Sequence, residues 1–336
     1  MARAAGNSGP RLHTAHAVRY ALGAVAGSFV MVLLHPAIGL PLAAAALAAL
    51  VYGGRTAYAY AASVVGGLLT GLAGHATLYV VVLPLVGVSG SAINSGAFTA
   101  LTIASLMLVG PGTVVLMRSG SPYRAVGLVI AGLSVMQMVT LWVFASAEGL
   151  TVAGFVGGAI EEMVAQAGVF GEMQDALASS WPALMVSMNG LAAILSVALV
   201  GRAGAMRGAA VRPLPPLAKL DLDPWLTVMP IAAIALLAAS RLPVAQAGTA
   251  GTVGLNVLIV ARWVFFLQGV AVFAGLYERA GFPRFTRAAG YALLGVTEAL
   301  VPLVSLTGLA DVWLNMRRLP RDGTGSKVVE TPPDTD

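Results

Sequence analysis

The stretch from Asn256 to Arg279, NVLIVARWVFFLQGVAVFAGLYER, constrains this chain more than any other feature. It holds about 22 mainly apolar residues before a charged end, and one helix of that length crosses the roughly 30 Å hydrocarbon core of a membrane. Arg262 lies near its centre, and Gln268 follows two turns later. Because a charge at that depth costs a few kcal/mol, we expect Arg262 to contact a carboxylate of the next apolar segment, with Glu298 as first candidate and Asp311 as second.

The composition predicts an all-α, polytopic helical membrane protein. Of the 336 residues, 58% are hydrophobic and 10% are charged, whereas soluble domains are about 25% charged. The apolar runs predict about eight or nine transmembrane helices, plus one amphipathic helix at the membrane interface. The absence of cysteine excludes disulfides, thiolate metal sites and a cysteine nucleophile. The net charge of +5 comes without alternating basic and aromatic residues, so we expect no nucleic-acid partner.

Polar breaks divide the chain into five segments. We expect a disordered cytoplasmic leader, an N-terminal helical membrane half, an acidic amphipathic segment, a C-terminal helical membrane half and a disordered tail, over residues 1–16, 17–146, 147–180, 181–316 and 317–336. In the acidic segment, apolar residues repeat at helical spacing while Glu161, Glu162, Glu172 and Asp175 lie largely on the other face. We interpret it as a helix on the membrane or on the bundle, with an external lid over a cationic substrate as the alternative.

The expected transmembrane helices follow the apolar runs. They cover residues 17–34, 37–52, 57–86, 97–117, 125–145, 181–200, 225–239, 256–279 and 287–315. The third run is too long for one upright helix, and Gly66, Gly67, Gly71 and Gly74 interrupt it, so we expect either one tilted, broken helix or one helix plus a short re-entrant piece. Gly110-Pro111-Gly112 predicts a kink near the end of the fourth run.

The distribution of arginine predicts a cytoplasmic N-terminus. If the third run crosses once, the leader, Arg55, Arg118 and the basic loop 202–219 share one side of the membrane, and the acidic segment lies on the other. About nine crossings would then leave the arginine-bearing tail outside, against the positive-inside rule. Either the run at 57–86 or the run at 287–315 is therefore not a simple span.

Four motifs of the C-terminal third stand in an order that resembles one family: PPLAKLDLDPWL, NVLIV, FFLQG and GLADVWLNMRR. They resemble the YybS-like family of bacterial predicted membrane proteins. A proline-marked turn after the first apolar run and Asn189 inside the sixth run fit the same family. The resemblance covers most of the chain and implies a multi-pass protein of the bacterial inner (plasma) membrane with no established activity. The N-terminal half is also similar in architecture to substrate-binding membrane subunits of vitamin transporters of the energy-coupling-factor type.

The candidate site combines charged and amide side chains that lie inside apolar runs: Arg262, Glu298, Asp311, Gln268, Asn256 and Asn189. The charged members form either a solute or proton site or a structural ion pair. The amides, together with Gln137, are more typical of hydrogen bonds between helices. His35 and His75 have no histidine or carboxylate at metal-ligand spacing, so we expect no metal site and no cofactor.

The function predicted from these features is binding or transport of a solute. The sequence has no nucleotide-binding loop, zinc-protease motif or serine-hydrolase motif, so we expect no enzyme. Buried polar groups and the glycine-rich third run favour a transporter, or a substrate-binding membrane subunit that works with an ATPase module or another membrane protein. The alternative is a non-transporting scaffold that binds envelope proteins through its basic loops and through GxxxG faces such as Gly23–Gly27. The substrate class is not predicted.

Overall fold

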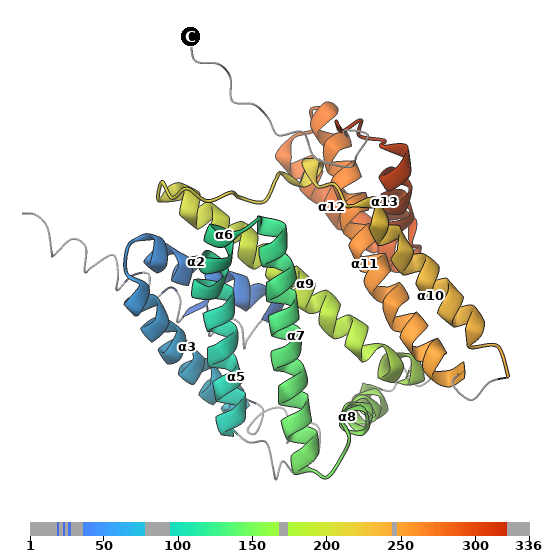
Figure 1. The fold of residues 1–336 in the computed structure, drawn as a ribbon, viewed down its shortest axis with the longest axis horizontal. Helices are drawn as coiled ribbons and strands as arrows, with labels where there is room; N and C mark the ends of the chain where they lie inside the picture. Colours follow the sequence, from blue (N-terminus) through green and yellow to red (C-terminus); the bar gives the residue numbers. More distant parts are fainter. Residues whose placement is uncertain are drawn as a thin grey trace, which may run out of the picture. The chain divides into compact units, whose positions relative to one another are not determined.

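A computed structural model describes residues 36–77, 95–167, 174–243 and 247–320, together with Arg19, Gly23, Ala26 and Gly27 (Figure 1). The regular elements of these residues are all helical, which agrees with the predicted all-α class. The chain divides into two compact units, Met1–Leu214 and Pro215–Asp336, here called unit 1 and unit 2. The expected helix at 17–34 lies almost wholly outside the described residues.

The described part of unit 1 is built from apolar helices. They are α2 (Pro36–Tyr52), α3 (Thr56–Thr77), α5 (Ser95–Met107), the π-helical turn η2 (Leu108–Gly112), α6 (Thr113–Ser119), α7 (Pro122–Ala147), α8 (Val152–Ala167) and α9 (Gln174–Met206). Runs rich in alanine and leucine favour helices, and a helix bonds its own backbone groups, as a membrane requires. The predicted helices at 37–52 and 125–145 correspond to α2 and α7.

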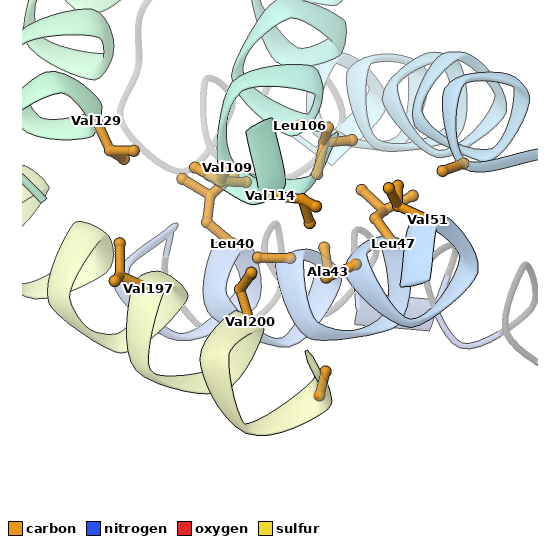
Figure 2. Close-up of a cluster of buried hydrophobic side chains, with 14 of the residues drawn as sticks. Leu40, Ala43, Leu47, Val51, Leu106, Val109, Val114, Val129, Val197 and Val200 are labelled. Carbon is orange, nitrogen blue, oxygen red and sulfur yellow. The ribbon is translucent and has the colours of Figure 1, made fainter. Parts of the chain in front are cut away.

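The core of unit 1 is centred on α2. Its alanine-rich surface packs against α9 and against η2, and Figure 2 shows Leu40 of α2 near Val109 and Val200, and Leu47 near Leu106. Leu47 is fully buried, and a Cβ on Gly110 would lie 2.7 Å from its Cβ. Small residues therefore let these helices approach closely, as is common in membrane bundles.

The glycines of α3 do not interrupt it, which corrects our expectation. The helix continues through Gly66, Gly67, Gly71 and Gly74 to Thr77, and the rest of the predicted run to 86 lies outside the described residues. A Cβ on Gly67 would lie 2.8 Å from Ile103 Cα, and one on Gly71 would lie 2.8 Å from Thr99 Cα. These glycines serve the contact between α3 and α5, so this GxxxG face is used within the chain. Gly27 likewise lies against Ala43 of α2.

The kink predicted at Gly110-Pro111-Gly112 is the π-helical turn η2, between α5 and α6. Proline has no N–H and interrupts the regular hydrogen-bond ladder. The Thr113 backbone N–H donates to the Leu108 carbonyl oxygen, and the Thr113 hydroxyl donates to the same oxygen at 3.1 Å. One extra residue in the turn thus restores bonding around Pro111.

The acidic segment 147–180 forms parts of two helices rather than one. Its first part is α8, which packs against α7 and α9 with Val164 buried and Glu161 exposed. From Gln174 onwards it is the beginning of α9, so the helix predicted at 181–200 starts earlier. The last residues of the segment belong to an apolar helix long enough to cross a membrane.

Unit 2 consists of a helical hairpin and a bent helix pair. Its elements are the 3-10 turns η4 (Leu217–Lys219) and η5 (Pro224–Thr227), then α10 (Val228–Ala239), α11 (Ala247–Arg279), α12 (Arg284–Leu300) and α13 (Leu303–Leu314). In the α10–α11 hairpin, a Cβ on Gly254 would lie 3.0 Å from Leu236 Cβ. The single helix predicted at 287–315 is instead broken after Leu300, where α12 and α13 meet at 101°.

The predicted number of eight or nine transmembrane helices is not confirmed. Within the residues that the structure describes, four helices are long and apolar enough to cross a membrane, or five if the bent pair is one span. They cover residues 99–119, 122–147, 174–206 and 248–279. Shorter apolar helices lie at 38–52, 56–72 and 224–239.

Candidate functional site

The bent pair α12–α13 starts and finishes at the same end of α11. α12 begins just after α11 ends, and its last turn reaches the middle of α11, where Glu298 contacts Arg262. After the bend, α13 runs back, and Arg317 lies beside Gly275 and accepts a bond from Arg279 through its carbonyl oxygen. Figure 1 shows both helices beside the C-terminal half of α11. The bend is therefore the point of the pair that lies farthest from that end.

Two glycines allow α13 to cross α11 in backbone contact. A Cβ on Gly308 would collide with the Phe265 carbonyl oxygen, and a Cβ on Gly269 would collide with the Val304 carbonyl oxygen. A backbone atom cannot turn aside as a side chain can, so any larger residue would force the helices apart. These glycines belong to the FFLQG and GLADVWLNMRR motifs.

Arg262 bonds Glu298 at the bend, as the sequence predicted. Its Nε donates to Glu298 Oε1 at 2.7 Å, and its Nη2 donates to the Glu298 carbonyl oxygen. In a continuous helix that carbonyl would accept from the residue four positions on, which here is Pro302 and has no N–H. Arg262 thus supplies the hydrogen bond that the last turn of α12 lacks.

Glu298 in turn caps the first turn of α13. Its Oε2 accepts from the Ser305 backbone N–H at 3.0 Å, and its Oε1 accepts from the Ser305 hydroxyl at 2.9 Å. The residue before α13 is Pro302, which provides no side-chain cap. The Arg262–Glu298 ion pair therefore places a cation at the C-terminal end of α12 and an anion at the N-terminal end of α13. Both helix dipoles favour this arrangement.

A cavity of about 280 Å³ lies beside the Arg262–Glu298 ion pair, between α10, α11 and α13. Apart from Arg262 and Ser305, its wall consists of apolar residues: Pro230, Leu258, Ala261, Phe265, Pro302, Leu306 and Leu309. The Glu298 side chain is 11% exposed and that of Arg262 is 45% exposed. Arg262 is therefore the charged group that a molecule in this cavity would meet, and the volume is near the lower limit for small-molecule sites.

A second polar cluster joins α11, α13 and the segment before η5. Gln268 Nε2 donates to Asp311 Oδ2 at 2.9 Å and to Asp221 Oδ1 at 3.4 Å. Arg317 Nη2 donates to Asp311 Oδ2 at 2.8 Å. Gln268 and Asp311 are fully buried, and Arg317 is 3% exposed. Asp311 is therefore not the partner of Arg262, and three of the motifs that carry the family resemblance meet in this cluster.

Arg317 holds this cluster together. We expected a disordered tail from residue 317 onwards, but Arg317 is buried. Its Nη1 donates to the carbonyl oxygens of Ala218 and Leu220, which connects the segment around η4 to the residues that follow α13. α13 ends at Leu314, and the left-handed φ of 44° at Asn315 turns the chain back. Arg317 is thus part of the folded unit, while residues 321–336 lie outside the described part of the chain.

The remaining candidates lie elsewhere. Asn189 of α9 donates to Ser134 Oγ at 3.1 Å and to Gln137 Oε1 at 2.9 Å on α7, which confirms the predicted hydrogen bonding between helices in unit 1. Asn256 donates to the Thr252 carbonyl oxygen on its own helix. Among the described residues, no three histidine, aspartate or glutamate side chains are placed to hold a metal ion.

Sequence reasoning missed three residues of these two clusters. Asp221 and Arg317 lie in the motifs PPLAKLDLDPWL and GLADVWLNMRR, so the motifs themselves were the available signal. For Ser305, the available signal is its closeness to Pro302, because proline is common at the start of a helix.

Comparison with known proteins identifies a family without a known activity. The profile of the family described as "Predicted membrane protein (DUF2232)" matches residues 23–312, and the resemblance to YybS-like proteins is consistent with this match. No curated protein and no solved structure matches the chain.

Proposed function

The chain belongs to this family of predicted membrane proteins, and we propose that it binds a small solute at the bend between α12 and α13 and carries it across the bacterial inner membrane. One observation supports the proposal: the bend of 101°, the Arg262–Glu298 pair and a cavity of about 280 Å³ occur at one place. Broken helices with polar groups at the break are typical of transporters, because their free backbone ends bind substrate and ions.

The solute we propose has an apolar body and a polar or anionic end. The cavity wall is apolar except for the half-exposed Arg262 guanidinium and the Ser305 hydroxyl, so those two groups bind the polar end. An anionic end would compete with Glu298 for Arg262. Loss of that contact would free the Glu298 carbonyl and the first turn of α13, so binding and the geometry of the bend are coupled.

A cavity-blocking variant tests this function. Leu306→Trp fills the cavity from a residue that lines it, whereas Leu293→Trp changes an exposed leucine of α12 outside the cavity. Each purified protein is reconstituted into liposomes and exposed to a bacterial small-molecule extract, and the contents are analysed by mass spectrometry. We expect at least one compound to accumulate with the original protein and with Leu293→Trp but not with Leu306→Trp. Equal contents for all three, matching protein-free liposomes, would refute the proposal.

We further propose that the N-terminus lies in the cytoplasm, where an ATPase module would dock if the chain is a substrate-binding subunit. Capture of the intact chain from native membranes tests this point. A co-purifying ATPase pair supports the subunit; uptake by the reconstituted protein alone supports an independent transporter; co-purifying envelope proteins without any uptake favour the scaffold.

A further inference from the structure

The charges of unit 1 are separated along its length. Every cationic side chain of residues 1–214, apart from histidine, is an arginine, and every carboxylate lies between Glu148 and Asp175. Asp175 is in the first turn of α9, and Arg202 is near its end. Their separation of 27 positions corresponds to about 40 Å of helix. The arginines at the far end of α9 are therefore too distant for these carboxylates to neutralise.

Arginines from three helix ends lie together near the C-terminal end of α9. Arg118, in the last turn of α6, lies over the Tyr52 ring at 5.4 Å. Arg207, after α9, reaches Gly53, where a Cβ would lie 3.0 Å from Nη1. Arg55 follows in the same turn and lies over Tyr58. Figure 1 shows the end of α9 beside α2 and α6. The result is a cationic surface at the end of a helix that is long enough to cross a membrane.

A cavity of about 390 Å³ opens in this surface between α2 and α9. Arg202 and Arg207 line it together with Ala45, Ala46, Ala49 and Leu199. Both arginines are exposed, whereas Ala49 is 8% exposed and belongs to the packed part of α2. The cavity thus has a strongly basic edge and a wall of small apolar side chains.

We propose that this cavity binds one anionic phospholipid, with the phosphate on Arg202 and Arg207 and an acyl chain along the alanine wall. Guanidinium groups bind phosphate oxygens in pairs of hydrogen bonds, which lysine cannot do. Basic pockets between transmembrane helices at the membrane surface bind anionic head groups. The apolar wall distinguishes a lipid from a free phosphate ion, which would gain nothing from the alanines. The proposal concerns unit 1 alone and does not depend on the solute site in unit 2.

Lipid titration of the intact purified protein tests the proposal. The fraction of protein with bound lipid is measured by native mass spectrometry during addition of phosphatidylglycerol, and in parallel with phosphatidylcholine. The test variant is Arg202→Gln with Arg207→Gln. The control is Arg55→Gln with Arg124→Gln, which removes the same charge outside the cavity lining. We expect phosphatidylglycerol to bind about 25-fold more weakly to the test variant, since each arginine near an anionic head group contributes about fivefold. We expect less than about threefold weakening for the control.

Two further measurements distinguish a bound phospholipid from other bound anions. Ala46→Phe fills the apolar wall and leaves both arginines in place, so we expect weaker binding of phosphatidylglycerol. Excess inorganic phosphate should displace little lipid from the original protein. Equal weakening in the arginine control, equal binding of phosphatidylcholine, unchanged binding to Ala46→Phe, or full displacement by phosphate would each overturn the proposal.

Discussion

Arg262 and Glu298 depend on each other at the residue scale, because each bonds the other and also completes a helix end. In Arg262→Gln, the carboxylate and the carbonyl oxygen of Glu298 lose their charged donor. We expect this variant to lower the free energy of unfolding by about 2 kcal/mol, the value of a charged hydrogen bond. Titration with a denaturing detergent in mixed micelles measures the change. Arg241→Gln, at an exposed arginine of the same unit, serves as the control and should have little effect.

A double-mutant cycle shows whether the contact itself is responsible. After Arg262→Gln, adding Glu298→Gln should cost little more, because the carboxylate has already lost its charged partner. Full additivity of the two changes would contradict the contact.

The Arg317–Asp311 pair is more deeply buried than the Arg262 pair, so its loss should cost more. Arg317→Gln leaves the fully buried Asp311 carboxylate without its cationic partner and removes the bonds to Ala218 and Leu220. We expect a loss of about 3 kcal/mol or more in the free energy of unfolding. The neighbouring Arg318 is exposed, and Arg318→Gln is a matched control. Similar losses for the two variants, by the same detergent titration, would show that the buried cluster contributes nothing specific.

The sequence predicted one of these two pairs for a physical reason. Arg262 stands inside a long apolar run, where a charge needs a partner, and Glu298 lies within reach on the next run. Arg317 stands where an apolar run ends and a polar one begins, which is how most tails start. Its burial depends on the chain reversal at Asn315 and on the approach of residues 217–222, and neither is visible in a local pattern.

At the scale of elements, the crossing of α11 and α13 depends on the absence of a side chain at Gly308. Gly308→Ala would place a Cβ against the Phe265 carbonyl oxygen, so we expect destabilisation of at least about 2 kcal/mol. Gly295→Ala in α12 is the control, because nothing lies within 4 Å of its Cβ position. Alanine exceeds glycine in helix propensity by about 1 kcal/mol, so that variant should be neutral or more stable. Unfolding measurements that give both changes the same sign would contradict the backbone contact.

The bend between α12 and α13 had a signal in the sequence that a count of apolar residues overlooks. Pro302 removes a helical hydrogen bond and drives Val301 to an extended conformation, with φ −143° and ψ 132°. Pro111 has the same chemistry but produces only a π-helical turn in a helix that continues. The difference lies in the surroundings. Thr113 restores bonding at η2 locally, whereas the broken end of α12 is completed by Arg262 from another helix.

For the whole molecule, composition was sufficient to predict an all-α membrane protein. The number of crossings was not predictable from apolar length alone, because several apolar helices are shorter than a full span and one apolar run is bent. The positive-inside rule nevertheless identified two apolar runs, of which at least one could not be a simple span. The bent run at 287–315 is one of these two, and the other, at 57–86, lies partly outside the described residues.

The last prediction concerns the side of the membrane on which the bent pair ends. Because α12 starts at the end of α11 and Arg317 returns to it, we expect the pair to enter the membrane and leave on the same side. Arg279, Arg284, Arg287, Arg317 and Arg318 then share one surface, as the positive-inside rule favours. The chain has no cysteine, so single cysteines can be introduced at Ala280 and at Pro320, both exposed, and labelled with a membrane-impermeant maleimide. We expect both to react from the same side, while Leu150, between α7 and α8, and Ala209, after α9, react from opposite sides. Labelling of Ala280 and Pro320 from opposite sides would make the pair a broken span and would move the tail across the membrane.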